Sequence, residues 1–212
     1  MRVTIFGATG QVGKRLVRYA LAEGHTIIAF GRNIEELIEK DLQSDKLEAI
    51  KGSVFDQDEV FEAVKGADVV LSALGGSFDG TDKTRSLGIK TIVKQMEKAG
   101  VKRILAVGGL GILSTPDGTF ILDSPGYPAE YLPVGREHLK AFTHLKDSTL
   151  DWTYVCPPTI KDEDASDNYI TSVTYPPSPN NNKIAAGDIA AFMILEVAQN
   201  KHVRERVGIS AL

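Results

Sequence analysis

Short runs of apolar residues alternate with stretches of helical periodicity along the first half of this chain. Apolar runs that predict strands are Arg2–Phe6, Thr26–Phe30, Leu47–Ile50, Asp68–Ser72 and Val101–Val107. Helical periodicity predicts the intervening helices, the first from Gly13 to Ala22 and the others at Glu35–Lys40, Asp56–Lys65 and Thr84–Lys98. Such alternation predicts an α/β protein with a parallel sheet and helices on both of its faces.

The periodicity disappears between Leu110 and Pro133, where prolines and glycines interrupt the pattern. A loop of this length in a compact domain is usually functional or disordered, and we expect this one to cover a substrate. Beyond it the pattern predicts helices at Val134–Lys146 and Gly187–Asn200 and strands at Asp151–Val155, Tyr169–Tyr175 and Val207–Ser210. We expect the acidic run Lys161–Asp167 to be a solvated loop. No repeat or linker divides the chain, so residues 1–212 predict one domain, with a small substrate lobe from parts of 110–133 and 157–183.

A glycine-rich turn joins the first predicted strand to the first helix. Its residues are Gly7, Ala8, Thr9, Gly10, Gln11, Val12 and Gly13. Glycine permits the tight turn, the close approach of a pyrophosphate and the packing of the helix on the sheet. The N–H groups of the helix's first turn then face the phosphates. The spacing G-x-x-G-x-x-G differs from the standard G-x-G-x-x-G, but the strand and helix around it favour a dinucleotide site.

The end of the second predicted strand carries Gly31, Arg32 and Asn33. In NAD-specific folds an acidic residue about 20 residues beyond the glycines binds the ribose 2′-hydroxyl. Arg32 takes that place here, and a guanidinium can pair with a 2′-phosphate through two charge-assisted hydrogen bonds. We therefore expect NADP(H) to be preferred to NAD(H), with Arg32 and Asn33 among the cofactor-binding residues.

Small residues follow three further predicted strands. They are Gly52, Ser53 and Val54, then Ala73, Leu74 and Gly75, and finally Gly108 and Gly109. Ligands of open parallel sheets bind beyond the carboxyl ends of the strands. We therefore add these residues to the predicted cofactor site.

Composition and charge exclude several other classes of function. The net charge is −4 without a basic run, which argues against nucleic acid as a ligand. No apolar run is long enough for a membrane span, and no signal peptide precedes the first strand, so we expect a cytoplasmic protein. The single cysteine, Cys156, excludes a disulfide framework, and no Cys/His cluster has metal-ligand spacing. The expected partner is a small planar substrate, in a monomer or homodimer.

Motifs along the whole chain resemble the atypical short-chain dehydrogenase/reductase superfamily in its NAD(P)H-binding, NmrA-like branch. Within that branch the chain is most similar to the flavin reductase and biliverdin-IXβ reductase group. The matching segments are 6–13, Arg32, 52–54, 74–75, 150–153, 157–160 and 184–190. The resemblance implies a three-layer doubly wound Rossmann fold with a small C-terminal substrate-covering region. It also implies that Pro157, Pro158 and Thr159 contribute to the cofactor site.

The chain departs from that resemblance at residues that handle protons. No Tyr-x-x-x-Lys pair occurs in the later half of the chain. Gly109 stands where the flavin reductase has a serine, and Thr159 stands where it has a histidine. Ser53 replaces the usual acid after the third strand. The cofactor-binding apparatus is therefore expected to be intact, whereas the proton-handling apparatus is reduced.

Three residues remain as candidates for catalysis. His138 is the predicted acid, with a helix-surface histidine as the alternative. Tyr127 and Tyr131 could donate a proton or stack on a planar substrate. Cys156 is expected to be packed rather than reactive, because no cation neighbours it in sequence. Asp188 is expected to cap a helix rather than act as a base.

Two functions from different classes follow. Hydride transfer belongs to the nicotinamide, and a flavin or quinone can take its proton from water, whereas a simple ketone needs a placed acid. The missing tyrosine therefore favours an NADPH-dependent reductase of flavins, quinones or similar conjugated acceptors. The alternative is a non-catalytic NADP(H)-binding redox sensor. A nucleotide-sugar epimerase is disfavoured, because the part after Cys156 is too short for a sugar-nucleotide lobe.

Overall fold

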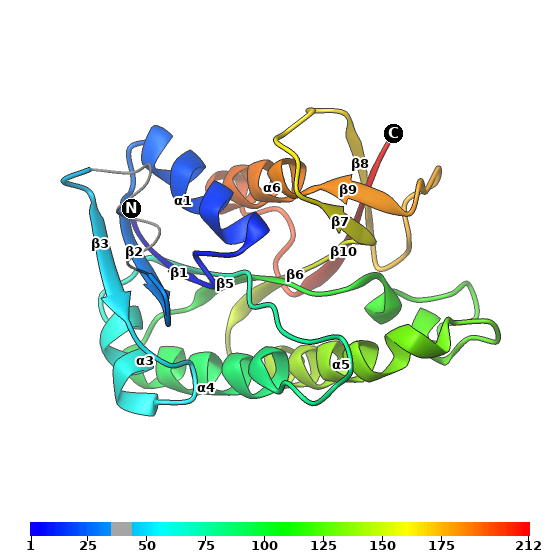
Figure 1. Cartoon of the computed structure of the whole chain (residues 1–212), viewed down its shortest axis with the longest axis horizontal. Helices are drawn as coiled ribbons and strands as arrows, with labels where there is room; N and C mark the ends of the chain where they lie inside the picture. The colour runs from blue at the N-terminus through cyan, green and yellow to red at the C-terminus, as the bar shows by residue number, and fades with distance from the viewer. Residues whose placement is uncertain (35–43) are drawn as a thin grey trace.

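The protein is a three-layer α/β structure with a central sheet between two layers of helices (Figure 1). The computed structural model describes residues 1–34 and 44–212, so the predicted helix Glu35–Lys40 lies outside the described residues. The strands are β1 (Arg2–Phe6), β2 (Thr26–Gly31), β3 (Leu47–Lys51), β4 (Val69–Ser72), β5 (Arg103–Val107), β6 (Asp151–Cys156), β7 (Thr159–Lys161), β8 (Tyr169–Val173), β9 (Lys183–Ala185) and β10 (Glu205–Ala211). The helices are α1 (Gln11–Ala22), α3 (Gln57–Val64), α4 (Thr84–Ala99), α5 (Leu132–Lys146) and α6 (Ala186–Gln199).

The 8-stranded sheet has the order β3-β2-β1-β4-β5-β6-β10-β8. All neighbours are parallel except β8, which pairs antiparallel with β10. The order 3-2-1-4-5-6 is that of a doubly wound Rossmann sheet and confirms the predicted fold class. The strand order reverses between β1 and β4, which is where such sheets bind ligands.

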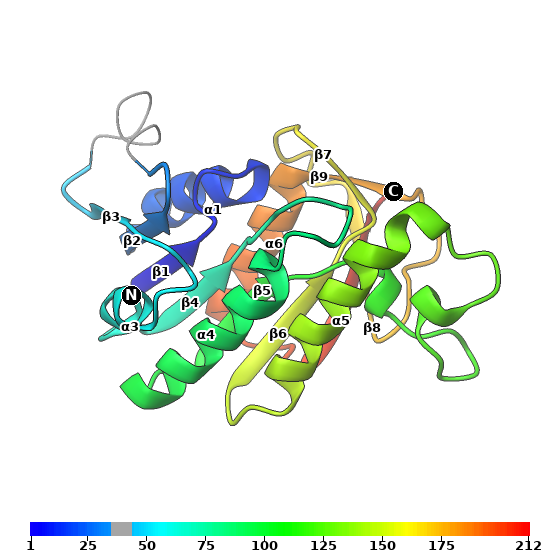
Figure 2. The same ribbon diagram turned by 60° about the horizontal axis from the view of Figure 1, so that its bottom comes forward.

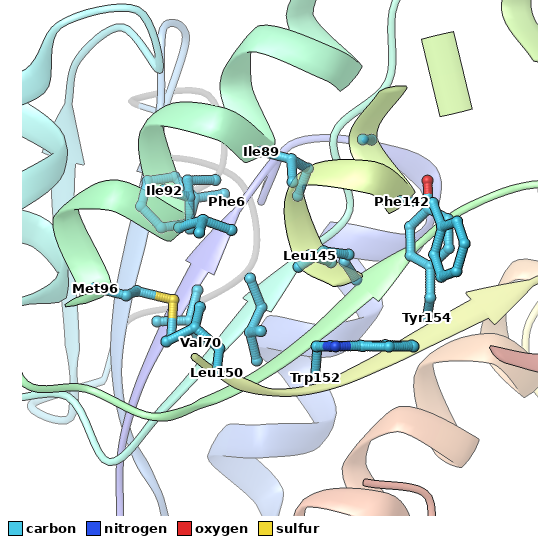
Figure 3. Packing of buried hydrophobic residues seen from close by; sticks show 14 of the residues in the cluster. Phe6, Val70, Ile89, Ile92, Met96, Phe142, Leu145, Leu150, Trp152 and Tyr154 are labelled. Atoms are coloured by element: carbon cyan, nitrogen blue, oxygen red, sulfur yellow. The ribbon is translucent and has the colours of Figure 1, made fainter. Parts of the chain in front are cut away.

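Alternate residues of each strand enter two separate cores. Val3 and Ile5 of β1 pack in the cluster under α1 and α6, whereas Phe6 joins the cluster under α3, α4 and α5. This division follows from the period of two in a strand, which points neighbouring side chains to opposite faces. Figure 3 shows the second cluster, where Met96 of α4 and Leu145 of α5 meet apolar residues of the strands. The two layers hold the strand ends fixed around the site.

The segment between β5 and α5 is more ordered than the sequence predicted. It contains three short 3₁₀ helices, η1 (Leu110–Ile112), η2 (Ile121–Asp123) and η3 (Ala129–Tyr131). Leu113 and Leu122 are fully buried and pack in the cluster beneath α4 and α5. These leucines, which stand among prolines and glycines in the sequence, anchor the segment to the core and order it.

The acidic run 161–167 is anchored to the first helix rather than free in solvent. Arg15 of α1 donates to Asp162 at 2.6 Å and to Asp164 at 2.9 Å, and Arg18 reaches Asp164 at 2.9 Å. These contacts lower the pKa of both carboxyl groups, chiefly through the hydrogen bonds from Arg15. Both aspartates keep exposed surface, in agreement with the expected solvated loop, and the ion pairs attach this loop to α1.

Asp188, in the first turn of α6, also binds the acidic run 161–167. Its carboxylate accepts from the backbone N–H groups of Ser166 and Asp167 at 2.8 and 3.0 Å, and from the Ser166 hydroxyl at 2.8 Å. The predicted helix cap is therefore an anchor for a separate loop. Figure 2 shows that loop, between β7 and β8, at the end of the sheet where α1 begins. Within the described residues no helix is both long enough and apolar enough to cross a membrane.

Candidate functional site

A pocket of about 1250 Å³ lies beyond the carboxyl ends of the parallel strands. It exceeds the roughly 300–1,000 Å³ that a drug-sized ligand needs, so it has room for more than one such ligand. Its lining includes nearly every residue of the predicted cofactor site: Gly7, Thr9, Gly10, Gln11, Val12, Arg32, Asn33, Gly52, Ser53, Val54, Ala73, Leu74, Gly75, Gly108, Gly109, Pro157, Pro158 and Thr159. Ala8 and Gly13 do not line it. Ala8 is buried in the cluster under α1 and α6, and Gly13 packs behind the turn.

The glycine turn forms one wall of this pocket. Gly7 adopts a left-handed conformation with φ of 75°, and its carbonyl accepts from the Gly10 N–H at 3.0 Å. α1 then begins at Gln11, and no side chain caps it and no acidic residue stands in its first turn. Its free N–H groups and the positive end of its dipole therefore remain open to an anion. This wall suits the pyrophosphate of a dinucleotide.

Two aromatic side chains fill the space behind the glycines at the end of β5. A Cβ on Gly108 would lie 2.6 Å from the Tyr154 ring, and one on Gly109 would lie 3.0 Å from the His138 ring. A serine at position 109 would therefore press on the His138 ring, which would have to shift by a few tenths of an ångström. Tyr154 packs against Phe142 in the core, with their ring centroids 6.0 Å apart (Figure 3).

His138 and Tyr154 are joined by a pair of hydrogen bonds. The Tyr154 hydroxyl donates to the His138 carbonyl at 3.2 Å, and it also lies 3.2 Å from Nδ1 of His138. In the tautomer with the proton on Nδ1, the histidine donates to the Tyr154 oxygen and Nε2 is the acceptor. Burial, assisted by the positive charge of Arg85, lowers the pKa of His138 to about 3. An imidazole that stays neutral is a poor general acid, so its burial argues against the acid role predicted for His138.

The pH dependence of stability follows from this histidine. Its folded pKa of about 3 lies below its usual value of 6.5, so protons bind the unfolded chain more readily and stability falls as pH drops from 6.5 toward 3. We expect His138→Gln to flatten this slope by up to about 1.4 kcal/mol per pH unit. Urea unfolding between pH 4.5 and 7 measures it. His144→Gln is the control with a smaller expected change, because His144 is less buried. Identical slopes for the wild type and His138→Gln would contradict the prediction.

The two tyrosine candidates lie on the segment between β5 and α5. Tyr127 is half-buried, and its hydroxyl lies close to the backbone of two glycines. A Cβ added to Gly111 would lie 2.8 Å from the hydroxyl oxygen, and one added to Gly135 would lie 3.3 Å from it. Burial raises the pKa of Tyr127. Tyr131 leaves 45% of its surface exposed at the rim of the pocket. Both side chains line the pocket, with Tyr127 packed against backbone and Tyr131 free to contact a ligand.

Sequence reasoning missed the residues that the loop after β4 and the start of α4 contribute. Phe78, Thr84 and Arg85 all line the pocket. Phe78 is 61% exposed, and the Arg85 guanidinium lies 5.5 Å from the centre of its ring. A Thr-Arg pair at a helix start gives no signal of burial, so only the fold could identify these residues.

Comparisons with known proteins agree with this geometry. A family model described as NAD(P)H-binding matches residues 7–200. Pinoresinol reductase 1 of Arabidopsis thaliana is 43% identical over 73% of this chain, which spans only 48% of that reductase's length. A provisionally named NADH-flavin reductase from Streptococcus pneumoniae superposes over all of both chains with a TM-score of 0.82 and 26% identity. A provisionally named epimerase from Bacteroides thetaiotaomicron superposes over 100% of this chain and 97% of its own, with a TM-score of 0.83 and 31% identity.

Proposed function

We propose, since this chain belongs to the NAD(P)H-binding family, that it is an NADPH-dependent reductase. It would transfer hydride to a flavin, a quinone or a similar conjugated acceptor. The observation that carries this proposal is the single pocket that runs from the glycine turn and Arg32 to His138 and the exposed rings of Phe78 and Tyr131. One end suits a dinucleotide, and the other end offers flat aromatic surfaces on which a planar acceptor could stack.

The cofactor fits the residues at the first end. The turn at Gly10 and the uncapped start of α1 suit the pyrophosphate. Arg32 is exposed at the carboxyl end of β2, and no acidic residue of the described chain lines the pocket to bind a 2′-hydroxyl. These features support a preference for NADP(H) over NAD(H). Ala73, Leu74 and Gly75 would lie along the sugar, and Pro157, Pro158 and Thr159 would close the far side.

The residues at the second end position the reactants and supply little proton chemistry. A bound nicotinamide supplies the hydride, and Gly108 and Gly109 leave room for its ring. Neutral His138 lies beside Gly109 and has one acceptor nitrogen to offer. Tyr131 lies at the exposed rim, where an acceptor would meet water. A conjugated acceptor can therefore take its proton from solvent, which a simple ketone could not do without a placed acid.

The absence of a placed acid also supports the second candidate, a non-catalytic NADP(H)-binding redox sensor. In the described part of the pocket, His138 is a neutral acceptor and Tyr127 has a raised pKa. A sensor needs the cofactor end of the pocket but has no use for an acceptor. The large second end with its exposed rings therefore favours the reductase.

Stopped-flow oxidation of NADPH against a panel of flavins, quinones and biliverdins tests the proposal, once calorimetry has established that NADPH binds. Turnover of a planar acceptor is the expected result. Tight NADPH binding without turnover of any acceptor would overturn the reductase and support the sensor. Failure to bind NADPH or NADH would overturn both functions.

A further inference from the structure

Every charged side chain that lines the described part of the pocket is cationic. The charged side chains in question are Arg32 and Arg85, and no described aspartate, glutamate or lysine lines the pocket. The chain as a whole has a net charge of −4, so this local excess of positive charge runs against its composition. A pocket that gathers arginines and excludes carboxylates attracts anionic ligands.

The two arginines belong to different ends of the pocket. Arg32 follows β2, whereas the positive charge of Arg85 helps to lower the pKa of His138, which packs against Gly109 at the end of β5. Three strand spacings of about 4.8 Å separate β2 from β5, which places their ends about 14 Å apart. Arg85 is bonded to the loop after β4 and its charge acts on His138, so it lies nearer than Arg32 to the end of the pocket at β5.

Arg85 carries a buried positive charge that forms no ion pair among the described residues, and the charges of Asp82 and Glu137 act on it only from beyond ion-pair distance. It is 7% exposed, and its Nη1 and Nη2 donate to the carbonyls of Ser77 and Gly76, each at 3.0 Å. No described carboxylate lies within ion-pair distance of its guanidinium. Burial lowers the pKa of Arg85, which reflects the cost of keeping this charge out of water.

The nearest carboxylates are engaged elsewhere. Asp82 accepts from the Thr84 N–H at 2.7 Å. Glu137 is held by Lys83 at 3.1 Å, by Lys140 at 2.8 Å and by the Ser86 hydroxyl. Two of the five guanidinium N–H groups of Arg85 donate to the loop, and the side chain lines the pocket. An incoming carboxylate or phosphate would pair directly with this charge.

We infer that Arg85 binds an anionic group of the acceptor, so that the acceptor is a planar conjugated molecule bearing a carboxylate or a phosphate. The inference rests on the proposed reductase function for the identity of the ligand as an acceptor. Phe78, whose ring lies beside the same guanidinium, would stack on the planar part while Arg85 pairs with the anion. Arg85 is thus a specificity residue in a different part of the pocket from Arg32.

Matched pairs of ligands test this inference without requiring turnover. Riboflavin and riboflavin 5′-phosphate differ by a phosphate, and 1,4-naphthoquinone and its 2-carboxylate differ by a carboxylate, so the two pairs also distinguish the two anions. Binding to the NADP⁺-loaded protein is measured by fluorescence quenching or calorimetry. We expect the wild type to bind the anionic member of at least one pair roughly 10- to 100-fold more tightly, the worth of a hydrogen bond to a charged group.

Three variants complete the experiment. Arg85→Gln should bring the two members of the pair to nearly equal affinity. Arg85→Lys should retain part of the preference, because lysine keeps the positive charge but lacks the two parallel N–H donors of a guanidinium. Arg136→Gln is the matched control, since Arg136 lies on the adjacent α5, pairs with Asp123 and does not line the pocket. It should keep the wild-type preference.

The outcomes separate this inference from the proposed function. Equal binding of both members by the wild type, or equal weakening of both members in Arg85→Gln, would overturn the role of Arg85. Anion preference that Arg85→Gln abolishes, with no NADPH oxidation, would support Arg85 as an anion site and overturn the reductase. NADPH oxidation by neutral acceptors without any anion preference would support the reductase and overturn the inference.

Discussion

Gly13→Ala should destabilise the protein severely. A Cβ at this position would lie 2.0 Å from the carbonyl oxygen of Gly7 and 2.8 Å from the Cα of Ala8. Both atoms belong to the backbone of the turn, so no side chain can move aside and α1 must shift from the sheet. We expect a loss of at least about 3 kcal/mol in the free energy of unfolding. For a chain of this size that loss corresponds to a fall on the order of 10 °C in Tm, measured by thermal unfolding.

Gly10→Ala is the matched control for this variant. A Cβ at Gly10 meets only the Gly7 carbonyl oxygen, at 3.4 Å, and its extended backbone suits alanine. The fold should therefore tolerate it, with Tm changed by only about 2 °C. The added methyl group projects at the wall of the pocket, so NADPH should bind at least about 10-fold more weakly. Similar losses of Tm in both variants would contradict the prediction that Gly13 is needed for packing of α1 whereas Gly10 is needed for cofactor binding.

Arg32→Ala should weaken NADPH binding much more than NADH binding. The loss of two charge-assisted hydrogen bonds to a 2′-phosphate costs on the order of 2–4 kcal/mol, or roughly 30- to 700-fold in affinity. NADH lacks that phosphate, so its affinity should change little. Calorimetric titration of both cofactors measures the difference.

Arg2→Ala is the control for charge alone. Arg2 begins β1 and therefore lies at the end of the sheet opposite the glycine turn. Removing its charge should leave the ratio of NADPH to NADH affinity unchanged. An equal loss of affinity for both cofactors in Arg32→Ala would mean that Arg32 does not read the 2′-phosphate.

The strand ends illustrate how much of the candidate site the sequence could predict. The predicted cofactor residues follow parallel strands, in the connecting turn or at the start of the next element, and these connections must meet at one edge of the sheet. Local sequence therefore fixed the membership of this wall without any knowledge of distances. Ala8 and Gly13 differ from the rest, because their side of the turn faces the core rather than the pocket.

The other end of the pocket could not be read in the same way. His138 lies on α5 and Arg85 on α4, and neither follows a strand. Their neighbours are set by how two helices pack on one face of the sheet, which brings together residues distant in the sequence. The pKa of His138 depends on that burial, so the sequence suggested an acid where the fold leaves a neutral acceptor.

The sequence by itself determined the alternation of strands and helices in the first half of the chain, the parallel sheet with helices on both faces, and the glycine turn with Arg32 after the second strand. These features follow from local periodicity and from backbone rules that hold wherever a parallel strand ends in a glycine turn. Only the tertiary structure decided the ordering of the 110–133 segment, the anchoring of the acidic run on Arg15, and the burial of Arg85 beside His138. The physical reason is that burial and electrostatics arise from contacts between residues far apart in the chain, which no local pattern encodes.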